Sequence, residues 1–288
     1  LLSYELVPLK VKNGHLGDYY HLNINCKYQN EIKKTELFAK YIFASTTFFQ
    51  DILDKGVSKK EDFFYTTFLP LLETNGLGSL INFGPKCYLS KSWLLVLDDL
   101  SKEGYIGLPP NQVIGYDGLK AILSKLATFH ASSILLEEIL SQKSGKRVTL
   151  NDLYSEFLEE YFITNEETNT FKVMLDSMVT GIKHLIQVMP EVTGKFRISP
   201  DELVKRLKEV FFKWIEKTAS SDTFRNVICH GDMYVSNALF KFNEHGVITE
   251  GQLIDFQGLR YCPLGHDVLY FIYISSLRET RIKYMDQL

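Results

Sequence analysis

A stretch near the carboxyl end carries two acidic residues and an asparagine in a pattern suited to phosphoryl transfer. Between residues 226 and 258, His230 and Asp232 follow an apolar run, Asn237 comes five residues after Asp232, and Asp255 lies at the end of a second apolar run. Phosphoryl transfer requires a carboxylate that orients and deprotonates the attacking hydroxyl, and oxygen ligands for magnesium. Mg²⁺ is a hard ion that takes carboxylate, amide and phosphate oxygens. The spacing therefore predicts Asp232 as catalytic base, with Asn237 and Asp255 as metal ligands.

The same pattern also has a structural explanation, because Asp and Asn are favoured in turns. Three features favour a functional site over a plain turn. An apolar strand precedes Asp232, a predicted hairpin separates Asn237 from Asp255, and a strand of buried type ends in the charged Asp255. The order of elements is that of a kinase catalytic loop followed by its metal-binding aspartate. We expect His230 to brace the loop through hydrogen bonds rather than to transfer a proton.

Composition excludes several other classes of function. The 288 residues are enough for one large domain or two lobes, and a net charge of −3 gives no support for a nucleic-acid footprint. No continuous run of about 18 apolar residues occurs, so the sequence predicts no membrane partner. The four cysteines are far apart and form no C-x-x-C pair, which favours reduced thiols and a cytoplasmic location.

Hydrophobic periodicity predicts an α+β protein whose two parts differ in character. In the first hundred residues, the pattern predicts strands within 1–45 with a turn at Gln29–Lys34 between two of them. A helix follows over 46–73, and further strands are expected over 86–98. The rest is mainly helical, with strands around the candidate loop. Helices are expected over 116–136, 151–161, 171–189, 200–219 and 267–278, and strands over 226–228, 237–242 and 247–256.

Short motifs in a common order resemble the ecdysteroid kinase-like family of insects, also called the CHK kinase-like family. That family is related to choline kinases and aminoglycoside phosphotransferases. The resemblance covers roughly residues 14–280. It is carried by GHLGDYYHL at 14–22, Lys40 in LFAKYIF, Glu61-x-x-Phe64-Tyr65 before Leu69-Pro70, PKCY at 85–88, LVLDDLSKEGY at 95–105, LATFHAS at 126–132, CHGDMYVSN at 229–237 and LIDFQG at 253–258.

The resemblance implies a bilobal protein-kinase-like fold with a small antiparallel β N-lobe and a larger, mainly helical C-lobe. It divides one kinase-like domain into an ATP-binding N-lobe at 1–97, a hinge and linker at 98–108, and a C-lobe at 109–288 with the catalytic loop and the acceptor-binding region. It also implies ATP and Mg²⁺ as cofactors. The implied acceptor is a hydroxyl of a small lipophilic molecule, such as an ecdysteroid or a hydroxylated xenobiotic.

Carried over residue by residue, the resemblance adds nucleotide-binding positions. Lys40 is implied to contact the α- and β-phosphates, with Glu61 paired to it. In the hinge, the carbonyl of Asp98 and the amide of Leu100 are implied to bind adenine. Asp267 is implied to brace the catalytic loop, and His130 is expected to be a buried structural residue.

Two departures and two alternatives accompany this interpretation. Tyr234 stands where the family usually has Trp, and no G-x-G-x-x-G phosphate loop is present, since Gly14 and Gly17 are a poor substitute.

A choline- or aminoglycoside-type kinase would need a pocket dense in carboxylates, for which the acidic stretches at 137–138 and 156–167 are candidates. A nucleotide-binding pseudokinase is the other alternative, against which the presence of all four residues of a working site argues. The sequence identifies neither the acceptor nor the oligomeric state.

Overall fold

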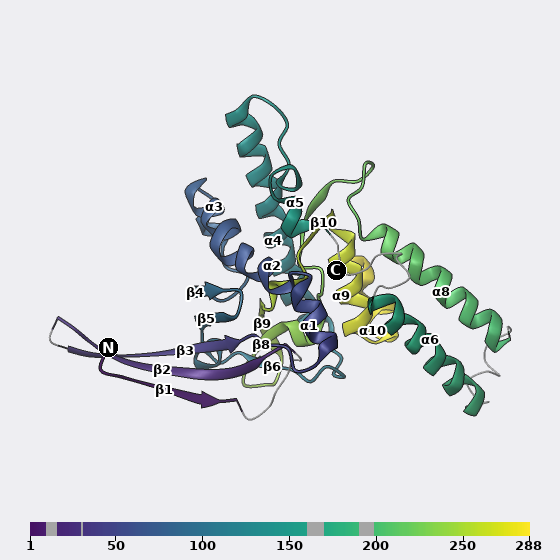
Figure 1. Ribbon diagram of the computed structural model, residues 1–288, viewed down its shortest axis with the longest axis horizontal. Helices are drawn as coiled ribbons and strands as arrows, with labels where there is room; N and C mark the ends of the chain where they lie inside the picture. Colours follow the sequence, from purple (N-terminus) through teal and green to yellow (C-terminus); the bar gives the residue numbers. More distant parts are fainter. Residues whose placement is uncertain (10–15, 30, 160–169, 190–198) are drawn as a thin grey trace.

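The computed structural model describes residues 1–9, 16–29, 31–159, 170–189 and 199–288. Its amino-terminal part is built on a five-stranded antiparallel sheet with the order β1-β2-β3-β5-β4 (Figure 1). The strands are β1 (Ser3–Pro8), β2 (Asp18–Tyr28), β3 (Glu31–Tyr41), β4 (Cys87–Lys91) and β5 (Leu94–Asp98). The predicted fold class is confirmed, because this sheet is followed by a mainly helical part.

The predicted turn between β2 and β3 is shorter than expected. Residues Glu31–Lys34 continue the β3 ladder opposite Lys27 and neighbouring residues instead of forming a polar turn. Their side chains are exposed, because this end of the β1–β3 ribbon projects beyond the body of the molecule (Figure 1). Polar composition therefore misplaced the turn, since neither face of a solvated ribbon requires apolar residues.

The helical segment expected at 46–73 is broken in the structure. It comprises α1 (Thr47–Asp54), α2 (Val57–Phe63), a π-helical turn (Phe64–Phe68) and α3 (Leu69–Thr74). The break falls at Gly56, whose backbone adopts a left-handed conformation with φ 90° that commonly ends helices. As a result, α2 is a separate short helix, and its Glu61 pairs with Lys40 on β3.

The carboxyl-terminal part contains the helices α4 (Tyr116–Ser144), α5 (Leu150–Leu158), α6 (Thr170–Val188), α8 (Pro200–Lys217), α9 (Gly265–Ser275) and α10 (Arg278–Tyr284). Residues 160–161 of the predicted helix at 151–161 lie outside the described residues, and the predicted helix at 171–189 corresponds to α6. Figure 1 shows α6 and α8 side by side, beyond α9. Short strands hold the candidate catalytic segment between these helices.

Two small sheets position that segment. β8 (Ala238–Phe242) and β9 (Ile248–Leu253) form the predicted hairpin, to which β6 (Ile106–Gly107) adds a third strand. β7 (Asn226–Cys229) pairs with β10 (Arg260–Pro263), a strand that the sequence did not predict. We expected the chain after Asp255 to run directly to a helix. The four-residue strand is too short to show a period, and its pairing with β7 is long-range.

Among the helices described, only α4 is long and apolar enough to span a membrane by length and hydropathy. Its apolar side is occupied within the protein, because Leu119, Ile122, Leu126 and Phe129 are fully buried. The core around α4 is rich in aromatic rings from both parts of the chain. Phe64, Phe83, Phe129 and Phe256 are in mutual ring contact.

Candidate active site

The candidate catalytic loop, residues 230–237, leaves the end of β7 and is fixed by a buried carboxylate on α9. Asp267 is fully buried and accepts hydrogen bonds from the backbone N–H groups of His230 (2.7 Å) and Gly231 (2.9 Å). Its Oδ2 also lies 2.8 Å from Nε2 of the buried His130. Although burial opposes ionisation, the hydrogen bond from His130 and the nearby histidine charges lower the pKa of Asp267. The expected bracing role of Asp267 and the structural role of His130 are confirmed.

The loop is packed tightly against the segment that carries Asp255. Gly231 has φ 82°, and a Cβ there would lie 1.9 Å from the carbonyl oxygen of Gly258. Only glycine fits both the backbone conformation and this approach. The ring of His230 is 2.9 Å from the carbonyl oxygen of Ile254, so it braces the loop as expected. The two acidic segments are therefore held in fixed relation by backbone contacts.

Asp232 and Asn237 interact within the loop. The side-chain amide of Asn237 donates from Nδ2 to the backbone oxygen of Asp232 (2.7 Å) and to its Oδ2 (3.0 Å). Burial raises the pKa of Asp232, and the neighbouring Asp255 raises it further, whereas His230, Asn237 and Arg260 oppose the change. A raised pKa makes the carboxylate a better proton acceptor than an ordinary exposed aspartate.

Lys40 joins the amino-terminal sheet to this segment. Its Nζ lies 2.7 Å from Oε2 of Glu61 on α2 and 2.6 Å from Oδ1 of Asp255. Burial would lower the pKa of Lys40, but the charges of Asp255 and Glu61 outweigh it and raise that pKa. Both side chains of the Lys40–Glu61 pair are nearly inaccessible, so the interaction is little screened by solvent. The structure thus contains the expected pair of Lys40 and Glu61, and it adds Asp255 as a second partner of Lys40.

The position of Asp255 depends on the residue that follows it. Asp255 adopts a left-handed conformation with φ 68°, which is uncommon for a residue other than glycine. The next ring, Phe256, is fully buried and stacks on Phe64 with ring centroids 3.7 Å apart. Its backbone N–H also donates to Glu61. Consequently the helix that holds Glu61 and the strand end that holds Asp255 are packed as one unit.

The predicted hinge residues lie at the end of β5. Asp98 is the last residue of the strand, and its backbone N–H donates to the carbonyl oxygen of Lys86 (2.9 Å). Leu100 begins a 3₁₀ turn capped by Asp99, and the first N–H groups of a helical turn have no acceptor within it. Leu100 thus has a backbone donor suited to a ligand, and adenine recognition by Asp98 and Leu100 stays a prediction.

Two residues on β2 lie beside the candidate site residues and were missed from the sequence. Tyr19 lies directly opposite Lys40 in the β2–β3 ladder and stacks on Phe38 with centroids 5.8 Å apart. Burial raises the pKa of Tyr19 to about 12, with Asp255 and Glu61 adding to the effect and Lys40 opposing it. On the same face, His21 lies 2.6 Å from the buried Asp99 at the start of the hinge. The alternation along β2 indicates which residues share a face, but it does not indicate which face lies toward Lys40 and Asp255.

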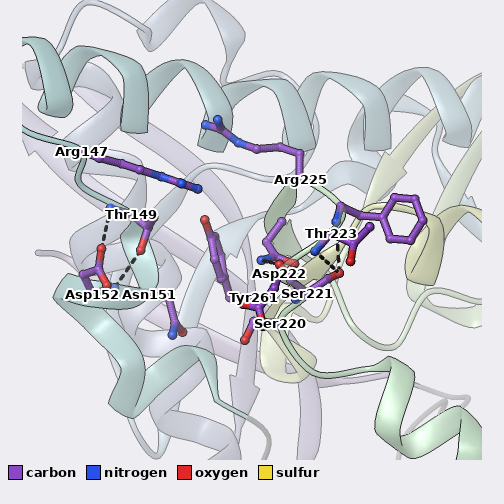
Figure 2. A pocket seen from close by; sticks show the side chains of 12 residues that line it. Arg147, Thr149, Asn151, Asp152, Ser220, Ser221, Asp222, Thr223, Arg225 and Tyr261 are labelled. Carbon is purple, nitrogen blue, oxygen red and sulfur yellow. Dashed lines mark hydrogen bonds between the residues drawn. The ribbon is translucent and has the colours of Figure 1, made fainter.

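A polar cavity of about 490 Å³ lies away from these residues. Figure 2 shows its lining, which includes Arg147 and Thr149 before α5, Arg225 at the start of β7, and Tyr261 on β10. Arg225 and Asn226 stand at the opposite end of β7 from the catalytic loop. None of the predicted site residues lines this cavity.

The fold and the paired Lys40, Glu61 and Asp255, which join the antiparallel amino-terminal sheet to the helical part, are those of a small-molecule kinase, a phosphotransferase. The chain belongs to the ecdysteroid kinase-like family, which its sequence matches over residues 14–288. The resemblance recognised from the sequence is therefore confirmed.

Comparison with curated proteins found no match. Among solved structures, the chain is similar to an aminoglycoside-3'-phosphotransferase of type VIII, with 14% identity, a TM-score of 0.44, and 98% of this chain and 84% of that chain covered. It is also similar to the amicoumacin kinase hAmiN in complex with AMP-PNP, Ca²⁺ and Ami, with 12% identity and a TM-score of 0.37. In that case 97% of this chain and 64% of the other are covered.

Proposed function

We propose that the protein transfers the γ-phosphoryl group of ATP, with Mg²⁺, to a hydroxyl of a small lipophilic molecule. The observation that carries the proposal is the position of Lys40, whose ammonium group bridges Glu61 and Asp255. A buried cation held between a helix carboxylate and a metal-type aspartate is the arrangement that phosphate binding requires in kinases. Asp232 and Asn237 lie on the loop packed against the same segment, where a base and a second ligand are needed.

The residues present fit a magnesium ion. Both hydrogen bonds of Asn237 use its Nδ2, so the amide oxygen on the other branch remains for a metal. Asp255 engages Lys40 through Oδ1, and its other oxygen is a second hard ligand. Asn237 and Asp255 would hold the ion, which supplies charge neutralisation for the phosphate oxygens when bound.

The chain's own groups account for the remaining chemistry. Lys40, fixed by Glu61, binds phosphate oxygens and withdraws charge from the leaving group. Asp232 accepts the proton of the acceptor hydroxyl, and its raised pKa brings its basicity closer to neutral pH. Asn237 holds the Asp232 carboxylate in one orientation. The proton stays on Asp232 until the product leaves, after which solvent removes it.

A screen of ATP consumption tests this proposal. Wild-type protein with Mg²⁺ and ATP is presented with ecdysone, 20-hydroxyecdysone, choline and an aminoglycoside, and the variant Asp232→Ala runs in parallel. We expect turnover with a steroid acceptor that disappears in the variant. Turnover with choline or an aminoglycoside alone would assign the chain to the cationic acceptors of the related kinases. ATP binding with no turnover of any acceptor would favour a pseudokinase.

We also propose that the protein works in the reducing environment of the cytoplasm. All four cysteines are free, and the two most buried, Cys229 and Cys262, lie in a small apolar cluster. Burial raises the pKa of Cys229 well above that of an ordinary thiol, so it reacts slowly with oxidants. Expression of the protein in the cytosol and through a secretory pathway, followed by thiol titration and an activity assay of each product, tests this. We expect the protein with all four thiols reduced to be active, and protein that has lost titratable thiols to be less active.

A further inference from the structure

Three aromatic rings from α8 and α9 form a wall beside the catalytic loop. Trp214 on α8 lies 6.0 Å from His266 and 6.4 Å from Tyr270, both on α9, measured between ring centroids. His266 and Tyr270 are 6.1 Å apart. Their planes differ by only 13° to 31° in the three pairs, so the rings face in nearly the same direction.

The wall reaches the residues that carry the chemistry. Nε2 of His266 is 3.5 Å from the carbonyl oxygen of Gly231, the residue immediately before Asp232. One helical turn further along α9, Tyr270 is close enough to the catalytic loop that Asp232 and Tyr234 act on its titration. Burial is the main reason that the pKa of Tyr270 is raised, and Asp232 adds to it. A molecule lying against the wall would therefore have one end next to the base.

Apolar residues precede Trp214 on α8. The positions three and four residues before Trp214 are Phe211 and Val210. On α9, the acidic neighbour Asp267 directs both oxygens to the catalytic loop.

Apolar surface continues outward from the three rings. Val210, Leu269 and Tyr273 are each more than half exposed, at 64%, 53% and 59%. Exposed apolar residues on two neighbouring helices are typical of a ligand-binding surface when they adjoin a functional site. Arg260, which also acts on the titration of both Asp232 and Tyr270, adds positive charge on this side of the loop.

We infer that the Trp214–His266–Tyr270 wall binds the acceptor, and that Trp214 stacks on a flat ring system of that molecule. Near-parallel rings favour stacking of a flat apolar molecule. The inference rests on the proposed function for the identity of Asp232 as the base, but it makes a separate statement about which residues contact the acceptor.

The two tryptophans of the chain allow a direct test by fluorescence. Trp93 lies at an exposed position beside Tyr41 in the amino-terminal sheet, so Trp93→Phe leaves Trp214 as the single reporter. We expect ecdysone, used as the probe, to change Trp214 emission saturably, whereas choline and kanamycin do not. The mirror variant Trp214→Phe retains Trp93, whose emission should not respond to ecdysone.

Calorimetry then measures the contribution of the ring. Truncating a buried aromatic anchor typically weakens binding by about 30-fold, and we expect a loss of this size in the affinity of Trp214→Ala for ecdysone. The affinity of Trp214→Phe for ecdysone should stay within about threefold of wild type. The affinity for Mg·ATP should be unchanged in both variants, and Trp93→Ala, the matched control, should bind both ligands normally. Thermal unfolding establishes that each variant is folded.

The outcomes separate this inference from the proposed function. Ecdysone binding at Trp214 in a protein that fails to bind Mg·ATP would support the wall and contradict the kinase chemistry. Intact Mg·ATP binding with no response of Trp214 to ecdysone would overturn the wall, whether or not ATP is consumed. Equal losses of Mg·ATP and ecdysone affinity in Trp214→Ala would also overturn it, because they would indicate a structural role.

Discussion

The proposed nucleotide side and the proposed acceptor side of the candidate site are built in different ways. On the nucleotide side, charged groups from distant segments are paired at fixed distances, as in the contacts of Lys40 with Glu61 and Asp255. On the acceptor side, Trp214, His266 and Tyr270 contribute ring faces with few directional bonds. Charge placement must be accurate for phosphoryl transfer, whereas apolar stacking tolerates variation. The comparison indicates a fixed reaction centre beside a surface that can change with the acceptor.

The largest expected effect on the nucleotide side comes from Asp255→Asn. The change weakens the proposed metal site but leaves the Lys40–Glu61 pair, so we expect a folded protein whose turnover falls by about 1,000-fold, since metal contacts supply several kcal/mol. Steady-state assays over a range of Mg²⁺ concentrations measure it. Asp222→Asn in the distant polar cavity is the matched control and should retain wild-type activity.

Lys40→Met should lower both activity and stability. It leaves Glu61 buried without its cation, and breaking a buried ion pair costs about 3–5 kcal/mol. The pKa of Glu61 is already raised by burial, and it should rise further in the variant. A carboxylic acid whose pKa is higher in the folded than in the unfolded state contributes stability that is fully present below the unfolded-state pKa. That contribution is lost as the pH rises toward the folded-state pKa. The stability deficit should thus grow from about pH 4 upward.

Urea unfolding of Lys40→Met and of Lys40→Met/Glu61→Gln at several pH values measures this effect. The double variant should recover much of the stability near neutral pH and lose most of the pH dependence, while remaining inactive. Equal stability of the two variants across the pH range would show that the buried carboxylate is not the cause.

Asp267→Asn tests whether the catalytic loop needs its charged brace. Two backbone donors would lose an ionised acceptor, and hydrogen bonds to charged groups contribute about 1.5–3 kcal/mol each. Because its folded pKa is lowered, Asp267 contributes stability that is present above its unfolded pKa and lost as pH falls. The difference in unfolding free energy between wild type and variant should therefore shrink below about pH 4. A difference independent of pH would contradict the ionised brace.

The smallest expected effect is that of Tyr19→Phe. The variant keeps the ring stacked on Phe38 but removes the hydroxyl that lies near Lys40 and Asp255. One hydrogen bond contributes about 1 kcal/mol, so the KM for ATP should rise roughly fivefold with kcat little changed. Tyr20→Phe, on the other face of β2, is the control. Equal effects at the two positions would remove Tyr19 from the nucleotide site.

The contrast between the two sides also explains what the sequence could predict. Asp232, Asn237 and Asp255 follow one another at short spacing around one hairpin, so local pattern was enough to group them. Lys40 and Glu61 were placed only through the family resemblance, and the structure then joined them at 2.7 Å.

The acceptor side offered no comparable signal. Trp214 and Tyr270 meet through packing of α8 against α9, and neither stands in a motif. Likewise β10 pairs with β7 although the β8–β9 hairpin lies between them in the chain, and Tyr19 meets Lys40 only through the pairing of β2 with β3. Such contacts depend on tertiary packing rather than on local residue type.

The central claim is that Asp232 removes the proton of the acceptor hydroxyl while the paired groups of the other lobe hold the nucleotide. Transfer of label from [γ-³²P]ATP to ecdysone by wild type and by Asp232→Asn, at saturating Mg·ATP, tests it most directly. General-base catalysis contributes about 10²–10⁴-fold, so the account predicts a loss of that size with Mg·ATP affinity preserved. Label transfer at the wild-type rate by Asp232→Asn would contradict it.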